Sequence, residues 1–114
     1  MNLYIYSEIS EQTMEKLKNI TPDTTIAIRE ANEEETIKIL DTLLQLGIKS
    51  NIELTVDDKE KFNHTKIFKD DKYDKLNITI KGAKIDPIKL IDYKYYENIL
   101  YSFIEPAQNK NYSP

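Results

Sequence analysis

The residues of this chain that could do metal or nucleophilic chemistry are few. His64 is the only histidine, and there is no cysteine. A thiolate metal site, a cysteine nucleophile and a site built from several histidines are therefore excluded. His64 lies in a charged segment without a second soft ligand, so we interpret it as a solvated loop residue. We expect no metal site and no catalytic residue with a recognisable motif.

Six carboxylates between residues 57 and 74 could suggest a calcium site. Calcium loops need oxygen ligands at fixed alternate positions around a glycine turn, and neither DDKEKF nor DDKYD has that glycine or spacing. Lysines alternate with these carboxylates, which is typical of a self-neutralising, solvated connection. A pair of Asp or Glu residues can do acid-base work without a readable motif, so an enzyme with an unrecognised carboxylate pair stays open as a third function.

The turns after the first two predicted strands oppose nucleotide binding. Phosphate sites use glycine turns and the positive end of a helix. SEISEQ has no glycine and two glutamates, and REANEEE places Glu33, Glu34 and Glu35 at the start of a helix. These carboxylates satisfy the helix dipole and would repel an anion. We expect neither a nucleotide nor another cofactor.

A tyrosine-rich stretch, residues 92–103, is the best candidate for a contact surface. On a helix, one apolar face would be buried, formed by Ile88, Ile91, Tyr95, Ile99, Leu100 and Phe103. Tyr96 would border this face, and Tyr93 and Tyr101 would point elsewhere. Such tyrosines can cover the edge of a core, or they can contact a partner, because Tyr is enriched at interfaces. We take Tyr93, Tyr96 and Tyr101 as possible partner contacts.

Charge bears on nucleic acid as an alternative partner. Four lysines (Lys81, Lys84, Lys89 and Lys94) lie close in sequence to tyrosines 93, 95 and 96, and charged grooves with aromatic platforms hold single strands. The net charge is −4, and Arg29 is the single arginine. Backbone affinity depends on a basic face. A small plasmid- or phage-type regulator that binds single-stranded nucleic acid is therefore the disfavoured second function.

The elements that would position these residues alternate between strands and helices. NLYIYSEI fits a strand covered on both faces, because apolar and aromatic side chains occupy successive positions. Ser10 is a natural N-cap for a helix with Met14 and Leu17 on its apolar face. TTIAIRE predicts a second strand. Asn32 then caps a well-marked helix that Gly47 closes.

The second half of the chain predicts two more strands and a helix. A third strand surrounds Ile52, and the charged stretch after it contains an uncertain short strand at residues 66–68. KLNITIKG predicts a fourth strand, antiparallel to a neighbour. Asp86 and Pro87 pair an N-cap with a proline at the first helical position, opening a helix to about residue 103. The order β-α-β-α-β-β-α predicts an α/β (α+β) fold, with a small mixed sheet of about four strands packed with three helices.

Length and composition suit one small domain. We assign residues 1–106 to a single α/β domain and residues 107–114 to a polar tail, or to the start of a linker to a further domain. No window approaches the ~20 apolar residues that span a bilayer, and the start lacks a basic leader. We expect a cytoplasmic protein without membrane contact. The Lys, Ile and Asn content is typical of AT-rich bacterial, plasmid or phage genes.

The two ends of the chain carry a family resemblance. LYIYSEIS at the start and YYENILYSFIEP with NYSP at the end look like the N-terminal region of certain bacterial transglutaminase-like proteins. The resemblance implies an accessory domain ahead of a cysteine-protease-like fold. None of that family's catalytic residues can be carried over, because this chain has no cysteine. We therefore interpret the chain as a non-enzymatic interaction or accessory domain, with a protein partner or a second copy of itself.

Overall fold

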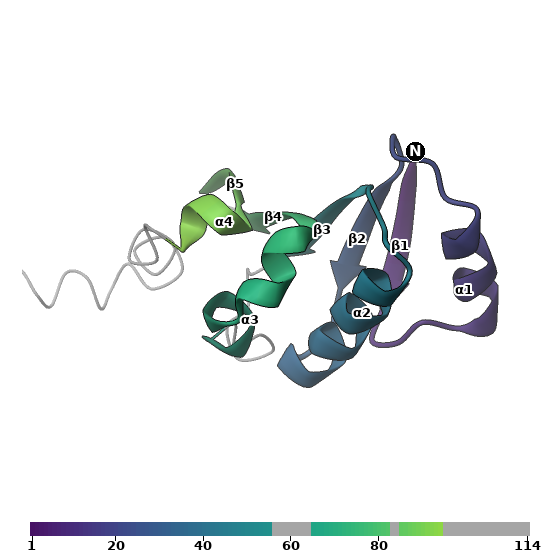
Figure 1. The fold of residues 1–114 in the computed structure, drawn as a ribbon, viewed down its shortest axis with the longest axis horizontal. Helices are drawn as coiled ribbons and strands as arrows, with labels where there is room; N and C mark the ends of the chain where they lie inside the picture. Colours follow the sequence, from purple (N-terminus) through teal and green to yellow (C-terminus); the bar gives the residue numbers. More distant parts are fainter. Residues whose placement is uncertain (56–64, 83–84, 95–114) are drawn as a thin grey trace, which may run out of the picture.

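The strands of this protein lie side by side in the order in which they occur in the sequence (Figure 1). The computed structural model describes residues 1–55, 65–82 and 85–94. Within these residues the sheet has five strands: β1 (Asn2–Tyr6), β2 (Thr25–Arg29), β3 (Asn51–Thr55), β4 (Asn77–Gly82) and β5 (Ile85–Lys89). The first four are parallel, and β5 is antiparallel to β4. The predicted α/β class with a mixed sheet is confirmed, with one strand more than expected.

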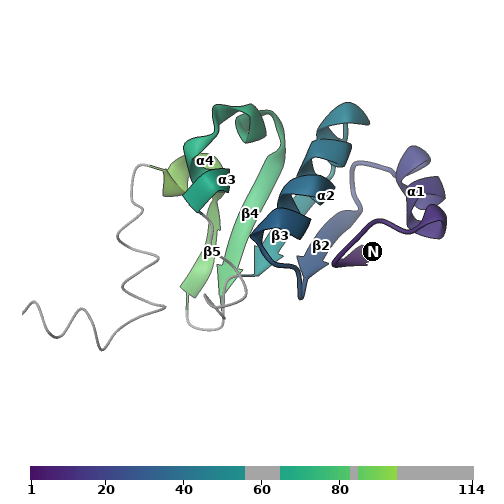
Figure 2. The same ribbon diagram turned by 90° about the horizontal axis from the view of Figure 1, so that it is seen from below.

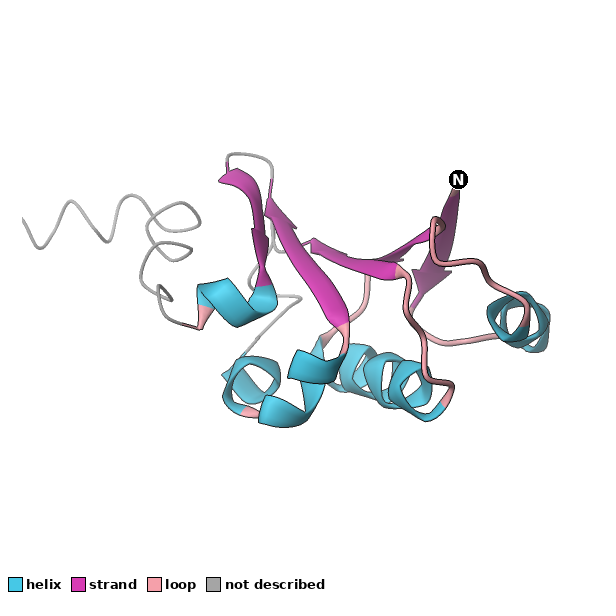
Figure 3. Ribbon diagram, turned by 45° about the horizontal axis from the view of Figure 1, so that its top comes forward, coloured by secondary structure: helices cyan, strands magenta, loops and turns pink. Residues whose placement is uncertain are grey.

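The connections between the parallel strands place their helices on one side of the sheet. The helical elements are α1 (Glu11–Lys18), α2 (Glu33–Gln45), α3 (Thr65–Lys69), the 3₁₀-helix η1 (Asp71–Lys75) and α4 (Leu90–Tyr93). Crossovers between parallel strands are right-handed, and here each one advances to the next strand in the same direction. Helices α1, α2 and α3 therefore lie on the same side, as Figures 2 and 3 show.

The opposite side of the sheet, which we call the open face, is not covered by any helix of the described ranges. This arrangement corrects one expectation. The first strand was predicted to be covered on both faces, but Tyr4 and Tyr6 are 42% and 52% exposed, whereas Ile5 between them is buried. The sequence pattern alone could not reveal that every crossover helix would fall on the Ile5 side.

The core lies between the sheet and the helices. Alternate residues of β2, β3 and β4 point towards the helices and are buried, and they pack against one face of α1 and α2. The sheet contributes Ile26, Ile28, Ile52, Leu54, Ile78 and Ile80, and the helices contribute Leu17, Ile39, Leu40 and Leu43. Each such side chain contributes roughly 1.5–3 kcal/mol by leaving water. This layer supplies most of the hydrophobic free energy of the fold.

Helix α2 is defined by its two caps, as the sequence predicted. The Asn32 side chain accepts a hydrogen bond from the Glu35 N–H at 2.8 Å, and the Glu35 carboxylate accepts one from the Asn32 N–H at 3.0 Å. At the other end Gly47 has φ of 65° and the Ile48 N–H bonds to the Leu43 carbonyl at 3.2 Å. Glycine adopts this left-handed conformation without steric cost, which ends the helix.

The connection from β3 to β4 differs from the prediction. The uncertain strand at residues 66–68 is wrong, because this segment belongs to helix α3. Strands β3 and β4 are parallel, so the chain must cross back over the sheet between them, and such crossovers are usually helical. Four side chains in its described part are buried: Ile67, Phe68, Tyr73 and Leu76. The described part of the charged stretch is therefore a packed element of the fold, where we expected a solvated connection.

The segment Asp86-Pro87 is also not a helix start. Both residues belong to β5, which pairs with β4 through a register that shifts between Ile80 and Gly82. Proline is tolerated at edge strands and at bulges because its missing N–H leaves no ladder bond unmade. The expectation that the fourth strand has an antiparallel neighbour is confirmed. The neighbour is β5, whose residues were predicted to begin a helix.

Helix α4 presents a different face from the one predicted. Tyr93 is only 1% exposed, and its ring lies 4.4 Å from that of Phe68, between centroids. Ile91, expected in the core, is 52% exposed. The prediction counted the helical period from Ile88, but Ile88 belongs to β5 and the helix starts at Leu90. The buried side chains are consequently Leu90 and Tyr93.

Replacing Tyr93 by Ala should therefore lower the free energy of unfolding by about 3 kcal/mol or more, as large-to-small aromatic changes in cores do. Ile91→Ala is the matched control on the same helix, and it should change stability by no more than about 0.5 kcal/mol. Urea unfolding followed by circular dichroism measures both. Equal effects of the two substitutions would contradict this placement of α4.

The capping box of α2 allows a second stability test. Asn32→Ala removes one of its two hydrogen bonds and should cost about 1 kcal/mol, the usual penalty for losing an N-cap. Asn32→Asp preserves an acceptor and should recover most of that loss. Thermal unfolding of the three proteins gives the comparison, and an unchanged midpoint for Asn32→Ala would contradict the cap.

Candidate interaction surface

Alternation along the strands determines which side chains reach the open face. In each parallel strand the residues between the buried apolar positions point away from the helices. The register then aligns Tyr4 with Ala27, Ala27 with Glu53, and Glu53 with Thr79. Lys89 of β5 faces Thr79. The open face is thus a continuous row of aromatic, small, acidic, hydroxyl and basic side chains.

One end of the open face is aromatic. The rings of Tyr4 and Tyr6 are stacked, with centroids 6.5 Å apart and an interplanar angle of 24°. The Arg29 guanidinium lies over the Tyr4 ring at 5.0 Å from its centroid. We call Tyr4, Tyr6 and Arg29 the aromatic patch. Two exposed rings next to an exposed guanidinium offer apolar area together with several hydrogen-bond donors.

The aromatic patch owes its positions to strands β1 and β2. Tyr6 and Arg29 are aligned across the parallel pair, as are Tyr4 and Ala27. Ala27 is small and is only 2% exposed, so it lies below the level of its neighbours. The Asn2 side-chain amide donates a hydrogen bond to the Tyr4 hydroxyl at 3.3 Å. The cation–π contact and this hydrogen bond fix the Tyr4 ring on the surface.

The rest of the open face is polar and is bonded to itself. Glu53 and Lys81 form an ion pair at 3.0 Å, in which the Glu53 side chain is 17% exposed. The Lys89 ammonium donates to the Asn77 side-chain oxygen at 2.7 Å, and the Thr79 hydroxyl donates to the Asn51 side-chain oxygen at 3.0 Å. Such cross-strand pairs stabilise a sheet. These groups form a polar border on one side of the aromatic patch, and their hydrogen bonds are largely made within the sheet.

The structure does not place the predicted contact residues Tyr93, Tyr96 and Tyr101 on a described surface. Tyr93 is buried against Phe68, so its expected surface position is wrong and it cannot present an exposed ring to a partner. Tyr96 and Tyr101 lie outside the described residues, as does His64. The surface tyrosines found in their place are Tyr4 and Tyr6. The signal for them was the alternation within NLYIY, but the sequence does not say which of its two faces is covered.

The proposed lysine and tyrosine groove is not formed by its described members. Lys94 is only 16% exposed at its side chain and pairs with Asp74 at 2.6 Å and with Asp71 at 3.5 Å. Lys81 pairs with Glu53. Tyr93 is buried, and Lys84 lies outside the described residues. The charges of Lys81 and Lys94 are therefore partly neutralised by their carboxylate partners.

The acidic start of α2 has structural partners. Glu35 completes the capping box, and the Glu33 carboxylate accepts a hydrogen bond from the Lys66 backbone N–H at 3.0 Å. Lys66 lies in the first turn of α3, so Glu33 connects the starts of two helices. A carboxylate at a helix start satisfies free N–H groups there. These two glutamates consequently have the capping role expected from the sequence.

A second polar cluster lies on the helix side of the sheet. The Tyr73 hydroxyl donates to the Asp41 carboxylate at 2.9 Å, and the Lys72 ammonium lies 3.2 Å from the same carboxylate. Burial and the neighbouring Asp41 carboxylate raise the pKa of Tyr73 to about 12. A general acid or base works best with a pKa near the operating pH. The Tyr73 hydroxyl therefore serves as a hydrogen-bond donor that ties η1 to α2.

Two further site classes can be assessed in the part of the chain that the structure describes. There, no group of three or more His, Cys, Asp or Glu side chains is arranged to hold a metal ion. A separate survey of the helices in residues 1–55, 65–82 and 85–94 finds none long and apolar enough to cross a bilayer.

The raised pKa of Tyr73 predicts an alkaline loss of stability. The folded pKa of about 12 exceeds the ordinary value of 10.0, so the stabilisation is complete below pH 10 and is lost as the pH rises through 12. The loss should be on the order of 3 kcal/mol, because the pKa is raised by about two units and each unit corresponds to roughly 1.4 kcal/mol. Urea unfolding of the wild type and of Tyr73→Phe across this range is the measurement. The stability difference between them should shrink with rising pH, and a constant difference would contradict the assignment.

Comparison with known proteins identifies no relative of this chain. No protein-family model, no curated protein and no solved structure matches it.

Proposed function

We propose that this chain is a non-enzymatic, cytoplasmic protein-binding module whose contact surface is the open face, centred on the aromatic patch. The observation that supports this function is the exposure of Tyr4 and Tyr6, stacked on each other beside Arg29, on a sheet face without a described helix over it. Exposed aromatic side chains cost free energy in water, and clusters of them often mark contact sites.

The residue types of the aromatic patch favour a protein partner. Tyr and Arg are enriched at protein interfaces and among the residues that dominate binding energy. The border formed by Glu53, Lys81 and Lys89 flanks the patch on one side and is polar, as the rim of an interface usually is. Because the backbone of a sheet is already ordered, binding at its surface costs little backbone conformational entropy.

Single-stranded nucleic acid is the alternative that the same patch must be tested against. Aromatic rings on a sheet can stack with bases. Of the three cations that the described strands place on the open face, Lys81 is paired with Glu53, and Arg29 lies over Tyr4. The net charge of the chain is −4. Few charges are left to release counterions from a nucleic acid backbone, so we favour the protein partner.

The resemblance of the chain ends to transglutaminase-like proteins extends this proposal. In a longer protein of that kind, the module would precede the catalytic domain and bind either the substrate protein or a regulatory partner.

The test is the selection of peptides from a displayed library on the immobilised protein, followed by fluorescence polarisation with the enriched peptides. Arg29→Ala and Tyr6→Ala should each weaken binding by about 10-fold, equivalent to about 1.4 kcal/mol. Lys18→Ala is the matched control, because it removes an exposed cation from α1, on the helix side. Tyr6→Phe retains the ring and should retain most of the affinity.

Two outcomes would overturn the proposed function. Enriched peptides whose affinity does not respond to Arg29→Ala or Tyr6→Ala would place the contact surface elsewhere. Sub-micromolar binding of single-stranded oligonucleotides, weakening steeply between ~50 and ~200 mM salt, would establish the nucleic acid alternative instead.

A further inference from the structure

The two edges of the sheet differ in how they are protected against pairing with another strand. Natural edge strands are usually blunted by proline, charge, bulges or a covering segment. The β5 edge carries Pro87, Asp86 and Lys89, together with a register shift against β4. The β1 edge has the sequence NLYIY, with no proline, charge or bulge. Only β1 therefore has the composition of a strand suited to pairing.

The backbone groups of β1 that face outward can be identified from its pairing with β2. The Thr25 N–H donates to the Met1 carbonyl at 3.0 Å, so Met1 directs its carbonyl towards β2. Along a parallel strand only alternate residues direct their backbone groups to a given neighbour. Asn2, Tyr4 and Tyr6 consequently direct theirs away from β2. In the described part of the chain, the Tyr6 carbonyl of this outward set accepts a backbone hydrogen bond from the Glu8 N–H. A carbonyl oxygen has two lone pairs, so the Tyr6 carbonyl can still accept a second bond.

The outward groups of β1 are arranged symmetrically about Tyr4. In an antiparallel pair, two opposed residues can exchange both of their backbone hydrogen bonds, and the next such pair lies two residues further along. A twofold axis at Tyr4 opposes Tyr4 with its own counterpart and Asn2 with the Tyr6 of the other copy. All three outward-facing residues then bond. Shifting the axis to Leu3 or Ile5 leaves one of the three without a partner.

We propose that two copies of this chain pair through β1 in antiparallel fashion about a twofold axis at Tyr4, forming one continuous sheet. The axis is perpendicular to the sheet, so the open faces of both copies lie on the same side. Leu3 of one copy then neighbours Ile5 of the other on the helix side, and the Tyr4 rings neighbour each other on the open face. The pairing opposes Leu3 with Ile5, Tyr4 with Tyr4 and Asn2 with Tyr6, and it places no like charges opposite each other.

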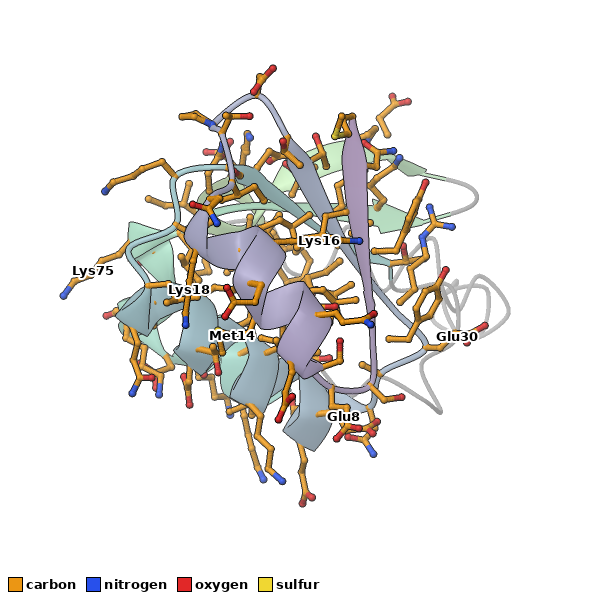
Figure 4. All side chains as sticks on the ribbon, turned by 90° about the vertical axis from the view of Figure 1, so that its right-hand side faces the viewer. Glu8, Met14, Lys16, Lys18, Glu30 and Lys75 are labelled. Carbon is orange, nitrogen blue, oxygen red and sulfur yellow. The ribbon has the colours of Figure 1, made fainter. Side chains whose placement is uncertain are left out.

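Helix α1 is compatible with this twofold arrangement through its charges. Figure 4 looks onto the side of the molecule where β1 and α1 stand in the foreground, with Lys16 and Lys18 on the helix. The first turn of α1 is acidic at Glu11, and its last turn is basic at Lys16 and Lys18. The twofold axis would make the α1 helices of the two copies antiparallel. The acidic first turn of each α1 helix then lies towards the basic last turn of the other α1 helix. Opposite charges facing each other in this way favour the pairing.

Self-pairing goes beyond the proposed function, because it uses the backbone of the β1 edge, whereas partner binding uses the side chains of the open face. It would join the two aromatic patches into one surface with two copies of each side chain. A partner with two contact segments could then bind both copies with increased avidity. Either property can hold without the other.

Disulfide cross-linking tests the proposal, since the chain contains no native cysteine. In the proposed register the two Tyr4 Cα atoms lie about 5.5 Å apart, within reach of a disulfide. Tyr4→Cys should therefore form a covalent dimer under mild oxidation. Tyr6→Cys is the matched control on the same strand and face. Its counterpart lies about 14 Å away along the strand, at roughly 3.4 Å per residue, which a disulfide cannot span.

A mixed experiment tests the register itself. In the proposed register, residue 2 of one copy lies opposite residue 6 of the other. An Asn2→Cys protein and a Tyr6→Cys protein therefore bring their cysteines together only when they form a mixed dimer. They should cross-link to each other roughly 10-fold faster than Tyr6→Cys does alone, because pairing raises the effective concentration of the two thiols. Equal rates for Tyr4→Cys and Tyr6→Cys would indicate random collision and would overturn the proposal.

Sedimentation equilibrium of the wild type tests the dimer without a cross-link. A single strand pair buries little area, so we expect reversible self-association in the micromolar range or weaker. Tyr4→Lys opposes like charges at the axis and should abolish it. Thr55→Lys adds the same charge away from the β1 edge and should not. A wild type that stays monomeric at millimolar concentration would overturn the proposal. Arg29→Ala should leave self-association intact, which separates this test from that of partner binding.

Discussion

The direction of the strand crossovers is the constraint on which the rest of this structure depends. Each parallel connection is right-handed and moves to the next strand on the same side of the previous one. A doubly wound sheet reverses this direction once, which covers both faces and creates the crevice where ligands bind. The described strands never reverse. Helices therefore accumulate on one face, and the described sheet lacks the topological switch point at which nucleotide sites usually occur.

The one-sided winding divides the side chains of the sheet into two chemical classes. The helix-facing positions hold the aliphatic residues Ile26, Ile52 and Ile78, which are aligned in register across the central strands and are 0–2% exposed. Their burial supplies the stabilising free energy. The opposite positions contribute little to that term, so they can carry aromatic and charged groups without destabilising the core. The aromatic patch and its polar border occupy this permissive face.

Two polar clusters in the described part of the chain have different physical roles. On the helix side, Tyr73 and Asp41 hold a protonated phenol in a buried environment, and the hydrogen bond joins η1 to α2. On the open face, Glu53 and Lys81 connect adjacent strands and stay in contact with water. The Tyr73–Asp41 hydrogen bond stabilises the packing of η1 against α2. The Glu53–Lys81 ion pair borders a surface that is suited to a macromolecular partner. The Tyr73 pKa of about 12 lies far from the mid-range value that acid-base catalysis requires.

Local sequence by itself determined the elements whose ends and periods are set by neighbouring residues. Ser10, Asn32 and Gly47 were sufficient to predict where α1 begins and where α2 begins and ends, because caps depend on hydrogen bonds a few residues away. Tertiary structure decided the rest. Pro87 entered a strand because β4 offered an edge. Tyr93 became buried because α4 starts after that strand. The exposure of Tyr4 and Tyr6 followed from strand order, which no local pattern encodes, since it arises only when the crossovers are placed on the sheet.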